Sequence, residues 1–254
     1  MATFVLVHGG GHGGWCYRPV AQRLRDQGHE VHAPSLTGLG ERAHLLPLLG
    51  RHIDLNTHVT DITGYLYYND LREVILVGHS YGGMVITGAA DRAADRIGRL
   101  VYLDAANPAD GQSLVDVAGP IMRAAREFGE TRDGVELVLL PGEGAGALYG
   151  VTDPDDLAWM DARLTAHPWA CFEQKLVLTN AVRLAALPTF HVVCTSTLAT
   201  RDPWLIKEAR ERGRLWDIDT GHDLMLTEPT RVAEVLLDIA AAPVESGAAR
   251  QDGG

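Results

Sequence analysis

Residues 73–84 read EVILVGHSYGGM, an apolar run that is followed by a serine between glycines and then by a helical pattern. The middle of this stretch matches G-x-S-x-G, with Ser80 in the serine position. In a sharp strand-to-helix turn, such a serine adopts strained backbone angles, and small residues two before and two after it prevent clashes. The turn exposes the hydroxyl and directs the first helical N–H groups, including that of Tyr81, toward an oxyanion. The stretch therefore predicts a nucleophilic serine at the end of a buried strand.

Short apolar segments alternate with helical patterns along most of the chain. Most of these segments are continuous apolar runs, as in parallel strands that are buried on both faces. The repetition predicts an α/β fold with a doubly wound, mostly parallel sheet of six strands. The expected strands are Thr3–Gly9, Glu30–Leu36, Glu73–His79, Arg99–Ala105, Thr189–Thr195 and Arg214–Asp219, and the expected helices are Trp15–Gln27, Asn56–Asn69, Ser80–Ala94, Trp204–Gly213 and Pro229–Ala241.

One interval, residues 107–188, interrupts this alternation. It contains a short apolar run at Val135–Leu140 but no convincing strand of the main sheet, and it is too long for a loop between neighbouring strands. We predict a core of residues 1–106 and 189–242 with a helical cap inserted at 107–188. The small and polar residues 243–254 predict a disordered tail. The expected cap helices are Ser113–Glu127, Asp153–Leu164 and Ala170–Leu184.

The composition is that of a globular protein, with 46% hydrophobic and 22% charged residues. A formal net charge of −11 argues against nucleic acid as a partner, because no basic stripe is available to neutralise phosphates. Three cysteines without a framework spacing fit a reducing cytoplasm. The sequence predicts neither a signal peptide nor a membrane span. We therefore expect a cytoplasmic protein, and the helix surfaces leave a homodimer open.

A glycine-rich loop, HGGGHGGW at His8–Trp15, follows the first expected strand. Consecutive glycines let the backbone approach a substrate closely, and the N–H of Gly10 can supply a second oxyanion donor. In open α/β sheets ligands bind at the carboxyl ends of the strands, where this loop is expected. Its position therefore favours a functional loop over a flexible connection.

The last expected strand is followed by TGHD at Thr220–Asp223. A histidine that follows the nucleophile fits the chain order serine, acid, histidine. His222 would accept the proton of Ser80 and later return it to the leaving group. Three other histidines lie in the glycine loop or beside the serine, where backbone positioning is their expected role: His8, His12 and His79.

Two aspartates compete for the role of the acid. Asp104 ends the strand after the serine turn, inside an otherwise apolar run, and a buried carboxylate there requires a partner. Asp202 precedes Pro203 and has the position of a helix N-cap. We favour Asp104 and keep Asp202 as the alternative.

Four stretches together resemble a known family: VLVHGGGHGGW (Val5–Trp15), VGHSYGGM (Val77–Met84), VYLDA (Val101–Ala105) and TGHDLMLTEP (Thr220–Pro229). Over residues 3–241 the chain resembles the α/β-hydrolase superfamily, and within it the small methylesterase and hydroxynitrile-lyase group and its bacterial relatives. The resemblance implies a core sheet ordered 4-3-5-6-7-8. It also implies a helical cap between the sixth and seventh strands.

Two departures from this group affect the expected chemistry. Plant members commonly carry their acid in a C-T-x-D pattern, but Thr197 stands where that aspartate would be, which moves the role toward Asp104. The lyases use a threonine in the glycine loop and a lysine after the histidine. These positions resemble Gly11 and Asp223 here, so nothing evident stabilises leaving cyanide and lyase activity is not expected.

We expect a serine hydrolase that cleaves a medium-sized, largely apolar carboxylic ester or lactone through an acyl-enzyme, without a metal or organic cofactor. One alternative is a cofactor-independent lyase, eliminase or cyclase of natural-product biosynthesis, which would form no acyl-enzyme. The other is a hydrolase-like receptor, which would bind a small hydrophobic ligand without turnover. The expected pocket residues are Gly11, His12, Met122, Phe128, Trp159, Trp169 and Leu224, and further apolar candidates in the cap are Tyr149, Met160 and Phe172.

Overall fold

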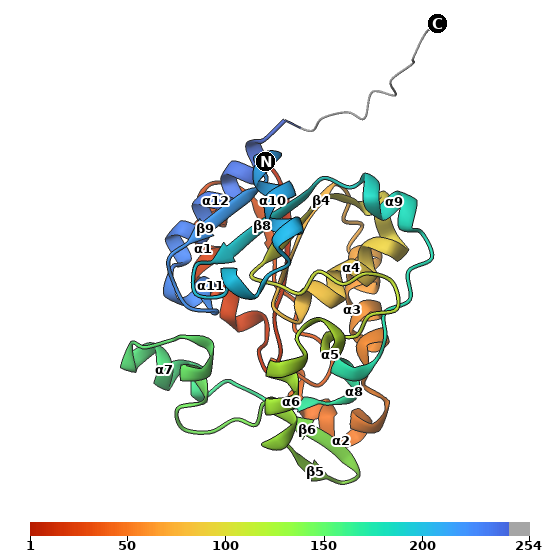
Figure 1. The fold of residues 1–254 in the computed structure, drawn as a ribbon, viewed down its shortest axis with the longest axis vertical. Helices are drawn as coiled ribbons and strands as arrows, with labels where there is room; N and C mark the ends of the chain where they lie inside the picture. The colour runs from red at the N-terminus through yellow and green to blue at the C-terminus, as the bar shows by residue number, and fades with distance from the viewer. Residues whose placement is uncertain (244–254) are drawn as a thin grey trace, which may run out of the picture.

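The computed structural model describes residues 1–243, and its centre is a six-stranded parallel sheet (Figure 1). The strand order is β2-β1-β3-β4-β8-β9. When these strands are numbered in chain order from 3 to 8, as in the family, this is the implied order 4-3-5-6-7-8. All six predicted strands are present, so the prediction of a parallel α/β sheet is confirmed. Their bounds are β1 (Thr3–Val7), β2 (Glu30–His32), β3 (Val74–His79), β4 (Ile97–Leu103), β8 (Thr189–Cys194) and β9 (Leu215–Ile218).

Helices pack on both faces of this sheet and divide the core into two apolar clusters. Side chains alternate along a strand, so Val5 and Leu76 face one cluster while Leu6 and Val77 face the other. Helices α3 and α4 pack together on the first face, and α1 and α12 pack together on the second (Figure 1). The bounds are α1 (Arg18–Asp26), α2 (Leu46–Leu49), α3 (Leu55–Tyr68), α4 (Gly82–Ala93), α10 (Pro203–Glu211), α11 (Leu224–Thr227) and α12 (Pro229–Ala241).

The interval between β4 and β8 is not purely helical, which corrects the expected cap. It contains a separate three-stranded antiparallel sheet ordered β5-β6-β7. The hairpin arises because Asp133 and Gly134 both have positive φ, the geometry of a two-residue turn that joins two strands. The elements are α5 (Leu114–Val117), α6 (Gly119–Glu127), β5 (Glu130–Arg132), β6 (Val135–Val138), α7 (Pro154–Asp161), β7 (His167–Pro168), α8 (Ala170–Glu173) and α9 (Ala181–Ala186).

The helix expected over Ala170–Leu184 is interrupted after α8. The backbone N–H of Leu176 instead donates to the carbonyl of Gln112, and that of Thr179 donates to the carboxylate of Asp91. Tertiary hydrogen bonds therefore override the local helical pattern here. No helix among the described residues is long and apolar enough to cross a membrane. The predicted tail lies outside the described residues, apart from residue 243.

Candidate active site

The turn after β3 has the strained geometry that G-x-S-x-G predicts. Ser80 has a φ of 53°, in the left-handed region that residues with a side chain rarely adopt. The flanking glycines leave the necessary space. A Cβ on Gly78 would lie 2.6 Å from the carbonyl oxygen of Gly82, and a Cβ on Gly82 would lie 2.6 Å from that of Val7. The turn therefore presents a half-exposed Ser80 at the edge of the sheet, directly before α4.

Asp104, directly after β4, contacts His222, directly before α11. The distance from His222 Nδ1 to Asp104 Oδ2 is 2.5 Å, and the carboxylate is buried. The competing aspartate, Asp202, instead caps α10 by accepting the N–H of Trp204 at 2.8 Å. Of the two candidates weighed from the sequence, Asp104 is thus the one placed against the histidine.

The second oxygen of Asp104 is held by three donors. Arg201 Nη2 and Thr197 Oγ1 each lie 2.6 Å from Oδ1, and the N–H of Cys194 donates to the same oxygen at 3.1 Å. Burial alone would raise the pKa of Asp104, but the hydrogen bond to His222, the charge of Arg201 and the bond from Thr197 hold this pKa well below its ordinary value. The carboxylate therefore stays ionised while it faces the imidazole.

The serine turn also holds the backbone of the histidine loop. His79 Nε2 donates to the carbonyl of His222 at 2.9 Å, and the two imidazole rings lie 4.6 Å apart between centroids. Burial lowers the pKa of His79 to about 3, so its ring is neutral. The Ser80 hydroxyl has no hydrogen-bond partner among the described residues. In many enzymes this contact becomes aligned only when a substrate is bound.

The glycine loop is held by hydrogen bonds while one of its N–H groups stays available. The N–H of Gly11 donates to His167 Nδ1 at 3.2 Å, and its carbonyl accepts the N–H of Thr165 at 2.8 Å. In the described part of the chain, no acceptor is found for the backbone N–H of Gly10 or Tyr81. These two N–H groups are the predicted oxyanion donors, and both remain free for a ligand.

His12 lies in a second imidazole–carboxylate pair, which corrects its expected place in the pocket. Its Nε2 is 2.8 Å from Asp223 Oδ2, its Nδ1 is 2.7 Å from the carbonyl of Gly10, and both side chains are fully buried. Burial alone would lower the pKa of His12, but the charge of Asp223 and the hydrogen bond to it raise the pKa above its ordinary value. A ring enclosed in this way does not line a substrate pocket.

The cap places apolar side chains against the glycine loop. A Cβ on Gly10 would lie 2.7 Å from Leu139 Cδ1 and 3.3 Å from Phe172 Cζ. The ring of Tyr149 stacks near that of His222, at 6.5 Å between centroids. The other predicted pocket residues are dispersed: Trp169 and Met122 are buried in the same cluster as Phe172, Leu224 and Met160 are buried in the opposite cluster, Trp159 packs edge-on against Trp15, and Phe128 is 80% exposed.

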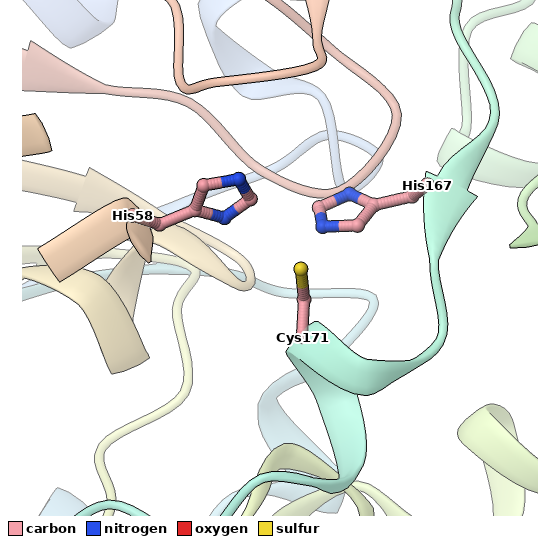
Figure 2. A group of neighbouring side chains, drawn as sticks. All are labelled: His58, His167 and Cys171. Atoms are coloured by element: carbon pink, nitrogen blue, oxygen red, sulfur yellow. The ribbon is translucent and has the colours of Figure 1, made fainter. Parts of the chain in front are cut away.

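A buried cluster of His58, His167 and Cys171 offers three atoms that could hold a metal, all within 4.8 Å of one another (Figure 2). Both nitrogens of His58 are already used, at 2.9 Å from the hydroxyl of Tyr81 and 2.9 Å from the carbonyl of Thr37. The Cys171 thiol donates to the carbonyl of Ile53 at 3.7 Å, so among these three side chains only His167 Nε2 is without a partner. A catalytic zinc site needs three protein ligands. The cluster therefore fits a hydrogen-bond network that fixes the side chain of Tyr81.

A family model described as the alpha/beta hydrolase family matches residues 4–235. The chain belongs to the α/β-hydrolase family. It is 38% identical to a carbendazim hydrolyzing esterase of Nocardioides sp. (strain SG-4G), over 93% of this chain and 98% of the relative. It is 29% identical to methyl jasmonate esterase 1 of Vitis vinifera, over 93% and 95%. This α/β-hydrolase also shares its fold with polyneuridine aldehyde esterase, with a TM-score of 0.75 at 20% identity and coverage of 94% and 99%.

Two parts of this arrangement were missed from the sequence. Arg201 lies in an unpatterned loop, and no sequence signal indicates that it reaches Asp104. For Asp223 the sequence comparison indicates only the absence of a lysine, yet this residue carries a carboxylate into the core. A charged residue directly between the histidine and the apolar LML of the next helix was an available signal that a buried partner exists.

Proposed function

We propose that this α/β-hydrolase is a serine esterase that cleaves a medium-sized, largely apolar carboxylic ester or lactone through an acyl-enzyme. The observation that carries the proposal is the contact between His222 Nδ1 and Asp104, together with the strained backbone of Ser80, whose neighbour His79 binds the carbonyl of His222. Two relatives over nearly the whole chain are named as esterases, which supports the same class of reaction. The function of the nucleophile is therefore assigned to Ser80, that of the base to His222 and that of the acid to Asp104.

The proposed reaction has two half-reactions. Ser80 Oγ attacks the ester carbonyl while its proton passes to His222 Nε2, and the N–H groups of Gly10 and Tyr81 hold the oxyanion. The tetrahedral intermediate collapses, and the alcohol leaves with the proton from His222. Water then attacks the acyl-enzyme by the same route and releases the acid. Asp104 accepts the Nδ1–H of His222, which fixes the tautomer and stabilises the imidazolium.

The proposed substrate class follows from the side chains that face the glycine loop. Leu139 and Phe172 contribute apolar groups next to Gly10, and Tyr149 stacks near His222. An ester group bound there would place its apolar acyl or alcohol part against the cap. Carbendazim and methyl jasmonate, which give two relatives their names, are the first compounds to test beside simple esters.

The test is hydrolysis of p-nitrophenyl esters from acetate to decanoate by the wild type and by Ser80→Ala. Loss of a triad member leaves only oxyanion binding, so we expect turnover to fall by about 10⁴-fold or more. Ser196→Ala is the matched control, because Ser196 is exposed and its hydroxyl only contacts the carbonyl of Thr220. We expect this variant to keep wild-type rates, and the chain-length optimum to report the size of the cap pocket.

A folded wild type that neither turns over an ester nor forms a covalent adduct at Ser80 with a fluorophosphonate would overturn the proposal. The alternatives would then gain support. Conversion of a ligand without an acyl-enzyme would indicate a lyase, eliminase or cyclase, and tight binding without conversion would indicate a receptor.

A further inference from the structure

The adjacent residues His222 and Asp223 take part in two different imidazole–carboxylate contacts. His222 faces the carboxylate of Asp104 at 2.5 Å, while Asp223 faces the ring of His12 at 2.8 Å. The first contact belongs to the proposed triad. The second has no part in the proposed proton transfers, although it joins the histidine loop to the glycine loop. A fully buried charged pair at this junction calls for a functional explanation, because burying charges is costly.

The hydrogen-bond partners of His12 define its protonation state. Nε2 faces a carboxylate and Nδ1 faces the carbonyl of Gly10 at 2.7 Å, so both partners are acceptors. Only a doubly protonated ring can donate to both. Two other ionisable rings contact that of His12, His79 at 6.2 Å and Tyr149 at 4.9 Å between centroids. His8 and His167 also interact electrostatically with His12, and burial lowers the pKa of both, which keeps them neutral. His12 is therefore an imidazolium that is neutralised by Asp223.

A second histidine of the same loop gives an internal contrast. His8 Nδ1 also donates to a glycine carbonyl, that of Gly9 at 2.8 Å. Its other nitrogen, however, accepts the N–H of Leu36 at 3.0 Å. One proton satisfies this ring, and burial lowers its pKa to about 3. The charge on His12 is thus a specific consequence of Asp223, since a buried histidine in this loop can be satisfied without one.

The peptide group between Gly10 and Gly11 is held from both sides. His12 binds its carbonyl oxygen, and His167 accepts its N–H at 3.2 Å. This fixes the plane of the peptide directly after the N–H of Gly10, which is the proposed oxyanion donor. On the other side of the pair, the N–H of Asp223 donates to the carbonyl of Tyr149 at 2.9 Å. Both loops that surround Ser80 are therefore connected through one charged pair.

We propose that the buried pair of His12 and Asp223 is a positioning element, which holds the N–H of Gly10 and the ring of His222 in the relative placement that transition-state binding requires. This inference rests on the proposed esterase function. His12 and Asp223 touch neither substrate nor reacting atoms, and they act through Gly10 and His222. The expected signature is a loss of transition-state binding with little change in ground-state binding.

The main test variant is Asp223→Asn, which keeps the shape of the side chain and removes its charge. Complete loss of an oxyanion donor costs about 10²- to 10³-fold in kcat. A misplaced Gly10 should therefore lower kcat by about 10- to 100-fold, while KM changes by less than about 3-fold. Affinity for a trifluoromethyl ketone, which forms a tetrahedral adduct at Ser80, should fall by the same factor as kcat/KM. A purely structural role would not produce this parallel loss.

Asp91→Asn is the matched control, because Asp91 is also a buried carboxylate. It accepts the N–H groups of Thr179 and Asn180, on the cap connection before α9. We expect it to lower the unfolding temperature without changing kcat or inhibitor affinity. His12→Gln should match Asp223→Asn in kcat, and the double variant should lose little more than either single one, since both remove the same pair. If Asp223→Asn fails to fold, His12→Gln alone provides the test.

A direct measurement of protonation completes the design. The ¹⁵N spectrum of the wild type at pH 7.5 should show both ring nitrogens of His12 protonated, and that of Asp223→Asn should show only one. A neutral His12 in the wild type would overturn the inference, as would a folded Asp223→Asn enzyme with wild-type kcat and inhibitor affinity. Either result leaves the esterase proposal intact if turnover depends on Ser80. Absence of Ser80-dependent turnover in the wild type would overturn both.

Discussion

Two imidazole–carboxylate pairs meet at the loop 222–223, and they differ chiefly in burial. In the pair of His222 and Asp104, the histidine side chain is 25% exposed, whereas in the pair of His12 and Asp223 both side chains are fully buried. An imidazole that is open to solvent and substrate can exchange protons during turnover. An enclosed imidazole cannot do so without leaving a buried carboxylate unpaired, which is strongly unfavourable. The same pair of residue types is therefore suited to proton transfer in one place and to fixed geometry in the other.

The surroundings of the two carboxylates reinforce this difference. Asp104 has a second cation, Arg201, so its charge remains compensated when His222 is neutral. Asp223 has no such partner among the described residues. Its Oδ1 accepts no hydrogen bond there, and His79 Nε2 lies 3.8 Å away. Asp223 thus depends on a charged His12, while Asp104 tolerates either state of His222.

The pair of His222 and Asp104 is called the open pair below, and that of His12 and Asp223 the sealed pair. The largest expected effect comes from Asp104→Asn, which breaks the open pair. An amide in this place favours the wrong tautomer of His222, and the corresponding change in a serine protease triad lowers kcat by about 10⁴-fold. We expect a loss of roughly 10³- to 10⁴-fold in kcat on the preferred p-nitrophenyl ester. Steady-state kinetics with active-site titration would measure it.

Asp202→Asn is the control for this prediction, because Asp202 carries the same charge but caps α10. It should cost about 1 kcal/mol of stability at most and leave kcat unchanged. The reverse result, an active Asp104→Asn and an inactive Asp202→Asn, would reject the assignment of the acid.

A smaller effect is expected from moving the carboxylate within the open pair. Thr197 stands where the resemblance to the plant methylesterase group would place the acid, and its Oγ1 lies 2.6 Å from Asp104 Oδ1. In Asp104→Asn/Thr197→Asp, a carboxylate would again lie near His222, with Arg201 beside it. We expect at least about 10-fold more activity than in Asp104→Asn alone, because the correct tautomer regains a partner. The matched variant Asp104→Asn/Thr197→Asn should show no recovery, and equal rates for the two would contradict the prediction.

Local sequence signals were sufficient for the open pair but not for the sealed one. Ser80 lies in a motif, and Asp104 and His222 follow apolar strands whose carboxyl ends meet at one edge of a parallel sheet. By contrast, the contact of His12 with Asp223 depends on how the glycine loop packs against residues 211 positions away. The cap hairpin shows the same limit, because its strands are short and only the Asp133-Gly134 turn marks them. Periodicity and motifs therefore located the sheet and its reactive edge, while tertiary packing decided which buried charges are paired.

The smallest expected effect is on the pH dependence of stability, and it distinguishes the buried neutral His191 from the buried charged His12. Burial lowers the pKa of His191 to about 4, with a further contribution from the charge of Arg201. Between this value and the unfolded pKa of about 6.5, the unfolded chain binds a proton that the folded protein excludes. Stability from His191 is therefore complete above pH 6.5 and is lost as the pH falls toward 4, by about 1.4 kcal/mol for each pH unit.

The pKa shift of His12 has the opposite sign to that of His191. Its folded pKa is raised by Asp223, so below pH 6.5 it is protonated in both states and adds no slope, and its stabilisation decreases only as the pH rises through the folded pKa. Urea unfolding from pH 7 to 4.5 gives the free energy of unfolding as a function of pH. For His191→Gln its slope should be smaller than that of the wild type by the contribution of about one proton. His12→Gln/Asp223→Asn, which also removes the carboxylate that would otherwise be left buried and unpaired, should be less stable but keep the wild-type slope below pH 6.5. A flattened curve for His12→Gln/Asp223→Asn would mean that the imidazole of His12 is neutral in the folded wild type, and the distinction between the open and the sealed pair would then be lost.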